Sequence, residues 1–189
     1  MSDTDIALLL CRIHWKGLHV QGGSESDLIS KLRVSLAAFE KRMSLEFKTS
    51  IHLTRCAFKS DLEQGSLFYA YWSPHVRELS SDSVSTPFRV TDEEILNYQE
   101  ALKTELNSVR VSGGDDSVDL SLSRLSEVMN LEGAKDQGVT QFHYVVETDV
   151  ENGWLEEVSR WYDIEHMPGL SQVPGCVNAK RYINLDSGP

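Results

Sequence analysis

The sequence predicts an α+β protein, built from ferredoxin-like antiparallel sheets with helices on one face. Two observations lead to this fold class. Apolar residues recur with a period of two in short segments and at helical spacing in longer ones. Over residues 1–111 these segments follow the order strand, helix, strand, strand, helix, which is the ferredoxin-like order.

Local patterns indicate each element of this first unit. Ile6–Trp15 begins as a continuous apolar run, as expected of a strand that is covered on both faces. The next segment has apolar residues at helical spacing, namely Leu28, Leu32, Leu36, Phe39 and Met43. Ile51–Phe58 alternates as a strand does, and Leu67–Trp72 is dense in aromatic residues. The polar turn Lys59–Gly65 between these two strands predicts a hairpin.

A second helix and a linker are expected to follow. Thr91 and Glu94 are spaced as a capping box at the start of an apolar helical stripe. Val109–Val111 is a candidate for a short fourth strand. Residues 112–138 predict a linker with a short helix, because a Gly- and Asp-rich stretch precedes apolar residues at helical spacing. These apolar residues are Leu122, Leu125, Val128 and Met129.

The second unit is expected to occupy residues 139–189 as strand, helix and strand. Alternation predicts a strand near 140–149, and a last strand is expected near 177–185. The helix is expected near 152–167 and to end at Pro168-Gly169. Trp154 and Trp161 are seven residues apart on this helix, which favours packing in the core, with Trp161 also able to wall a pocket.

Composition excludes several classes of partner. The net charge of −11 argues against nucleic acid and against an anionic membrane surface, since both require clustered Lys and Arg. No apolar run is long enough to span a bilayer, and Met1–Asp5 lacks the basic residues of a secretory signal. The three cysteines are odd in number and far apart, which favours a cytoplasmic location.

No cofactor and no metal site are expected. CxxC pairs, a P-loop, GxGxxG, GxSxG and HExxH are all absent from the sequence. His143 and Glu147 share a face of the expected strand but lie more than about 10 Å apart along it, too far to bind one metal ion.

A pattern in the second unit resembles a known family. Arg160–Pro168 (RWYDIEHMP) is followed by Val173-Pro174-Gly175 and then by Ala179-Lys180-Arg181-Tyr182. This order resembles the EthD-like members of the dimeric α+β barrel superfamily and lies within about a quarter of the chain. The resemblance implies a sheet-to-sheet homodimer, or equivalent packing within the chain. Because the family's unit continues after this strand, we expect the second unit to be incomplete.

The candidate site lies around His166. Tyr162, Asp163 and His166 crowd one side of the expected helix, where an imidazole near neutrality is suited to move a proton. His166 and Tyr162 are the candidate catalytic residues, and Trp161, Asp163 and Tyr182 the candidate substrate-binding residues. Three alternatives stay open: His166 stabilises the helix C-terminus, Asp163 is a solvated or capping carboxylate, and Tyr182 packs across strands.

Two functional hypotheses follow. The resemblance implies a cofactor-independent enzyme, of the cyclase, isomerase or monooxygenase type, acting on a small hydrophobic or aromatic carbonyl compound. The alternative is a non-catalytic small-molecule-binding or assembly module. The superfamily also includes haem enzymes, but no motif in the sequence indicates haem. A closed cavity at His166 favours the enzyme, and an interior filled by side chains favours the module.

Overall fold

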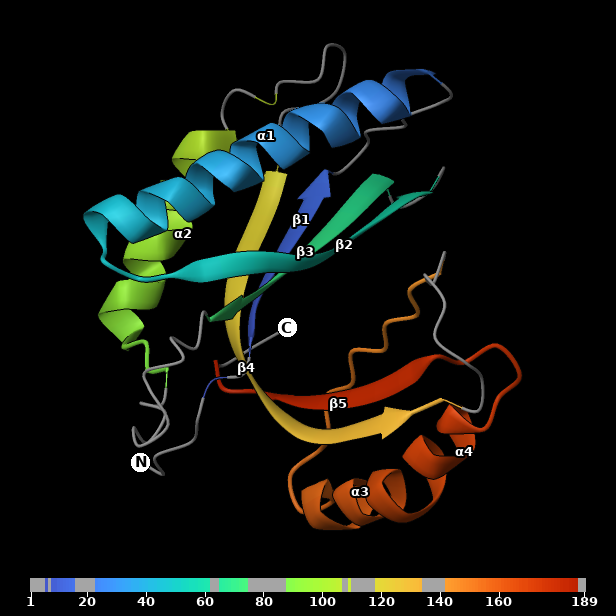
Figure 1. Cartoon of the computed structure of the whole chain (residues 1–189). Helices are drawn as coiled ribbons and strands as arrows, with labels where there is room; N and C mark the ends of the chain where they lie inside the picture. The colour runs from blue at the N-terminus through green and yellow to red at the C-terminus, as the bar shows by residue number, and fades with distance from the viewer. Residues whose placement is uncertain are drawn as a thin grey trace, which may run out of the picture. The chain divides into compact units, whose positions relative to one another are not determined.

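The computed structural model describes residues 6, 8–15, 23–61, 65–74, 88–106, 109, 118–133 and 142–186 (Figure 1). The elements are β1 (Leu8–Trp15), α1 (Gly23–Glu46), β2 (Ile51–Asp61), β3 (Gly65–Pro74), α2 (Asp92–Leu106), β4 (Val118–Glu132), α3 (Leu155–Trp161), the π-helical turn η1 (Tyr162–His166), α4 (Met167–Ser171) and β5 (Asn178–Asn184). The strands form one antiparallel sheet in the order β2-β3-β1-β4-β5. The predicted α+β class is therefore confirmed.

The chain divides into two compact units, Met1–Leu125 and Ser126–Pro189, so the division falls inside β4. In the first unit, β1 pairs with β3 on one side and with β4 on the other, and β3 also pairs with β2. The resulting order β2-β3-β1-β4 has the ferredoxin-like arrangement that the sequence predicted. The expected hairpin is confirmed, since β2 and β3 pair from Ile51 opposite Pro74 to Asp61 opposite Gly65.

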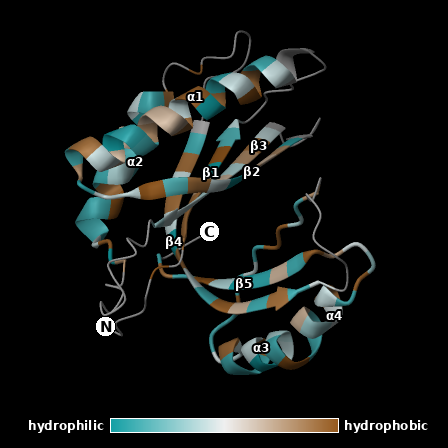
Figure 2. Cartoon of the chain, in the orientation of Figure 1, coloured by the Kyte–Doolittle hydropathy of each residue, from teal (hydrophilic) through white to brown (hydrophobic). Residues whose placement is uncertain are grey.

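The core of the first unit lies between α1, α2 and one face of the sheet (Figures 1 and 2). The predicted stripe of α1 is buried there together with Leu9, Cys11 and Ile13 of β1. Phe39 of α1 meets Trp72 of β3 edge to face, with ring centroids 5.3 Å apart. Phe68 and Trp72 are both buried within the single chain.

The start of α2 is fastened by side chains. Thr91 N–H donates to Glu94 Oε2 at 2.8 Å and Glu94 N–H donates to Thr91 Oγ1 at 3.2 Å, which confirms the predicted capping box. Arg124 of β4 donates to the carbonyl of Val90 at 2.6 Å and to Asp92 Oδ1 at 2.7 Å. These bonds attach the first turn of α2 to β4.

The expected short helix within residues 112–138 is wrong, because 118–132 form the long strand β4. Leu120 and Leu122 alternate with serines, and this period of two is typical of a strand. The spacing of Leu122, Leu125 and Met129 fits a helix equally well, so the sequence pattern is ambiguous. Pairing with β1 decides between them: Leu122 lies opposite Cys11 in the core. The fourth strand is thus β4, while Val109 belongs to no element and residues 110–111 lie outside the described part.

The second unit keeps the predicted helix and last strand. β5 coincides with the expected strand near 177–185. The helix continues through α3, η1 and α4 to Ser171 and does not end at Pro168. Met167 N–H donates to the carbonyl of Tyr162, five residues earlier, which is the hydrogen bond of a π turn. Pro168 follows directly and has no N–H to donate, yet the helix continues past it.

The predicted strand near 140–149 is not formed in the described residues 142–150, which carry no helix or ladder assignment. Residues 140–141 lie outside the described part. The alternation of apolar and polar side chains shows which residues would share a face of a strand, but it does not show whether a neighbouring strand is present to pair with. The prediction of a strand was wrong for this reason. Among the helices that the structure describes, none has the length and apolar character needed to cross a membrane.

Candidate functional site

The candidate site is built on η1, the π-helical turn between α3 and α4. A π turn is wider than an α-helical turn, so residues five positions apart come to lie on the same side. Trp161 and His166 are five apart, and their rings stack with centroids 4.5 Å apart and planes at 26°. Tyr162 meets the His166 ring edge to face, at 5.0 Å and 85°. The structure therefore brings three of the predicted site residues together.

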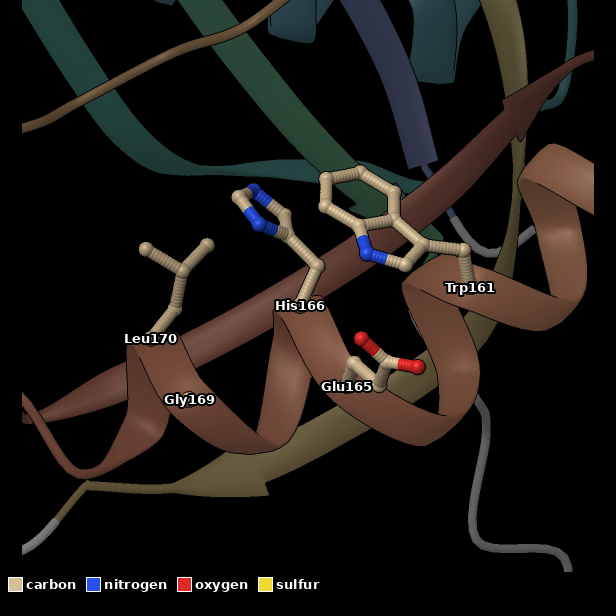
Figure 3. Close-up of a pocket in the computed structure, with 5 residues that line it drawn as sticks. All are labelled: Trp161, Glu165, His166, Gly169 and Leu170. Atoms are coloured by element: carbon tan, nitrogen blue, oxygen red, sulfur yellow. The ribbon is translucent and has the colours of Figure 1, made fainter.

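A shallow hollow of about 300 Å³ lies beside these rings and is widely open to solvent. Its walls are Trp161, Glu165, His166, Gly169 and Leu170. Figure 3 shows the side chains of Trp161, His166 and Leu170 projecting to the same side of the helix. The enclosed cavity that would favour an enzyme is not found among the described residues, and neither Tyr162 nor Tyr182 lines the hollow. The cause is that a single helical run supplies every wall.

Asp163 faces a different partner. Its carboxylate accepts a hydrogen bond from Arg181 of β5, whose guanidinium also donates to Ser159 Oγ at 2.9 Å. The same guanidinium lies 5.2 Å from the centre of the Tyr162 ring, in cation–π geometry. Arg181 thus ties η1 and α3 to β5. Asp163 is occupied by this ionic contact and does not line the hollow.

Tyr182 also points elsewhere. Its hydroxyl donates to Glu127 Oε2 of β4 at 3.2 Å, and Lys180 donates to the same oxygen at 3.1 Å. Tyr182 and Lys180 therefore share a strand face that makes cross-strand contacts, in agreement with the alternative that Tyr182 packs across strands. Among the candidate substrate-binding residues, only Trp161 lines the hollow.

Sequence reasoning missed three walls of the hollow: Glu165, Gly169 and Leu170. Leu170 was missed because Pro168-Gly169 was expected to end the helix. Trp154 and Trp161 are not core residues, since their exposed fractions are 55% and 44%. Trp154 lines a second open hollow of about 370 Å³ together with the acidic side chains of Asp149 and Glu151.

In the described part of the chain, no cluster of three or more His, Cys, Asp or Glu side chains is arranged to hold a metal ion. No protein-family model, curated protein or solved structure matches this chain. The structure thus defines an α+β protein whose second unit carries an open hollow walled by a stacked Trp161–His166 pair.

Proposed function

We propose that this protein binds a small aromatic or hydrophobic carbonyl compound in the hollow beside Trp161 and His166. The stacked Trp161–His166 pair carries the proposal. An indole that is 44% exposed at the edge of a hollow offers an apolar plane on which a flat ligand can stack. Leu170 adds an apolar wall to the same hollow.

His166 supplies the polar contact that orients such a ligand. An imidazole N–H donates a hydrogen bond to a carbonyl oxygen, and the half-buried ring of His166 lines the hollow. The contacts with Trp161 and Tyr162 hold this ring in place, so it need not be ordered when the ligand arrives. Two polar side chains, His166 and Glu165, lie on an otherwise apolar lining, and a few polar groups among apolar ones are the usual composition of a small-molecule site.

Proton transfer is the second candidate function, and the presence of Glu165 beside His166 in the hollow favours it. The pair would exchange a proton with a carbonyl compound in a cyclisation, isomerisation or oxygenation, with Tyr162 supporting the imidazole. The hollow is open to water, which weakens electrostatic stabilisation of a charged transition state. Binding without turnover is therefore the function that the geometry supports better.

We extend the proposal to an EthD-like, cytoplasmic homodimer. The resemblance in Arg160–Tyr182 supports the family assignment, and the three free cysteines Cys11, Cys56 and Cys176 suit a reducing compartment. A second copy would cover apolar side chains of the second unit that are exposed in the single chain. These include Phe142, Tyr144 and Val146.

The binding proposal is tested by titrating acetophenone, an aromatic ketone, into the full chain and following binding by saturation-transfer NMR. Trp161→Leu should weaken binding at least about tenfold, because it removes the stacking plane. Trp154→Leu is the matched control, since Trp154 is similarly exposed but lies at the other hollow. Equal losses in the two variants, or no binding to the wild type, would refute the proposed site.

His166→Ala separates the two candidate functions. For a binding protein, the change should weaken acetophenone binding several-fold and affect phenylethanol, which lacks the carbonyl, much less. For an enzyme, deuterium exchange at the methyl group of acetophenone should be catalysed by the wild type and abolished in His166→Ala. Absence of catalysed exchange in the wild type, with binding intact, would leave binding as the function.

A further inference from the structure

The segment 142–148 has the side-chain pattern of a strand but belongs to no ladder in the described part of the chain. Exposure alternates over residues 142–146: Phe142 is 89% exposed, Tyr144 82% and Val146 55%, whereas His143 and Val145 are partly buried. Glu147 and Thr148 are both exposed. Aromatic and β-branched residues in alternation are typical of a paired strand. Large apolar side chains left in water along such a segment therefore offer a surface to which another strand can add.

We propose that 142–148 pairs with the same segment of a second copy of this chain, antiparallel and about a two-fold axis through Val145. This inference rests on the homodimer proposed above and names its surface. A two-fold interface must be self-complementary, because each residue meets its counterpart across the axis. In this register Phe142 lies opposite the second copy's Thr148, Tyr144 opposite its Val146, and Val145 opposite its own counterpart.

The register is complementary in charge. It places His143 of each copy opposite Glu147 of the other, so one axis generates two imidazole–carboxylate pairs. These pairs are additional to the contacts that both residues make within their own chain. Aligning the segment parallel and in register would instead set Glu147 beside Glu147, which is unfavourable in a chain of net charge −11.

The apolar side chains are complementary as well. On the exposed face, Tyr144 of each copy lies beside Val146 of the other, and Phe142 lies beside Thr148. Aromatic and β-branched pairs are favourable cross-strand neighbours. Two such seven-residue strands with four aromatic side chains bury an area near the lower limit of specific interfaces, about 1,200 Å². The dimer should therefore be reversible and depend on protein concentration.

Cross-linking tests the register directly. Residues that face each other at a non-hydrogen-bonded position have Cα atoms about 4.5 Å apart, which suits a disulfide. Full-length protein carrying Cys56→Ser and Cys176→Ser, with the buried Cys11 retained, should form a covalent dimer under mild oxidation after Val145→Cys. Thr148→Cys is the control, because the two copies of residue 148 lie about 20 Å apart in this register. Equal cross-linking in the two variants would overturn the proposal.

Charge exchange tests the same register by sedimentation. Glu147→Lys and His143→Glu should each weaken dimerisation, by about tenfold for two disrupted pairs. An equimolar mixture of the two variants should recover dimers, because each mixed dimer restores complementary pairs at both positions. Glu156→Lys, an equal charge change on an exposed residue of α3, should have little effect. Failure of the mixture to recover dimers would overturn the proposed pairing.

The outcomes also separate this surface from the broader dimer proposal. A dimer that is unaffected by the changes at 143 and 147 uses another face, which overturns the role of 142–148 and leaves the homodimer standing. A monomer at all concentrations overturns both. Acetophenone binding in the hollow is measured independently of either result.

Discussion

Gly133 offers a sharp test of how the second unit is held together. It follows β4 directly, and its N–H donates to the carbonyl of Val177 at 2.9 Å, just before β5. A Cβ atom built on Gly133 would overlap the carbonyl oxygen of Cys176 and would lie 2.8 Å from the carbonyl carbon of Val177. Both neighbours are backbone atoms, so no side-chain rotation can relieve the clash.

Gly133→Ala should therefore separate the ends of β4 and β5. Steric overpacking of this kind costs about 3 kcal/mol when the neighbours cannot move aside. Loss of the hydrogen bond to Val177 adds about 1 kcal/mol. A decrease of this size is a large fraction of the total stability of a domain.

The assay is urea denaturation, combined with hydrogen exchange of the β5 amides. Gly169→Ala is the matched control, since a Cβ there meets nothing within 4 Å and the residue lies inside α4. This control should be neutral or more stable by about 0.5–1 kcal/mol, because alanine favours a helix. A Gly133→Ala protein as stable as the wild type, with β5 amides equally protected, would refute the close approach of the two strands.

Two further predictions concern the first unit. Arg124→Met should lower the free energy of unfolding, measured by urea denaturation, by about 1.5–3 kcal/mol, because it removes charged hydrogen bonds to Val90 and Asp92. The control Lys103→Met breaks an exposed ion pair with Glu100 and should lower it by about 0.5 kcal/mol or less. Equal costs would contradict the anchoring role of Arg124. Burial raises the pKa of the Cys11 thiol and of the Tyr98 phenol. Their contribution to the free energy of unfolding should be complete near neutral pH and be lost above about pH 8.5 for Cys11 and about pH 10 for Tyr98, where the unfolded groups ionise. Tyr98→Phe should make the decline above about pH 10 less steep and leave the part that is due to Cys11. An unchanged decline above this pH would contradict the assignment to Tyr98.

The first unit could be predicted closely from the sequence because its local and long-range signals agree. The capping box of Thr91 and Glu94 begins α2 as expected, and the alternation of Ile51–Phe58 forms the predicted hairpin with β3. β4 could not be predicted, since its leucines fit both a helical spacing and a period of two. The pairing of Leu122 opposite Cys11 is a long-range contact that local spacing does not reveal.

The candidate site could be predicted in part. The sequence placed Tyr162 and His166 on one side of the helix and named Trp161 as a candidate pocket wall, and the structure brings the three rings together. It did not reveal the π turn, which sets the stacking of residues five positions apart and carries the helix past Pro168. Because the helix was expected to end at Pro168, Leu170 was missed as a wall of the hollow. The ionic contact between Asp163 and Arg181 could not be predicted, since the sequence does not show that β5 lies beside the helix.

The two units of the chain differ in how far their aromatic side chains are buried. In the first unit Phe39, Phe68 and Trp72 are all buried between helix and sheet. In the second unit Phe142, Tyr144, Trp154 and Trp161 are substantially exposed. Large apolar side chains exposed together usually mark a binding surface. The hollow at Trp161 and the segment 142–148 share no residue, so the ligand and the second copy proposed here contact different residues of the second unit.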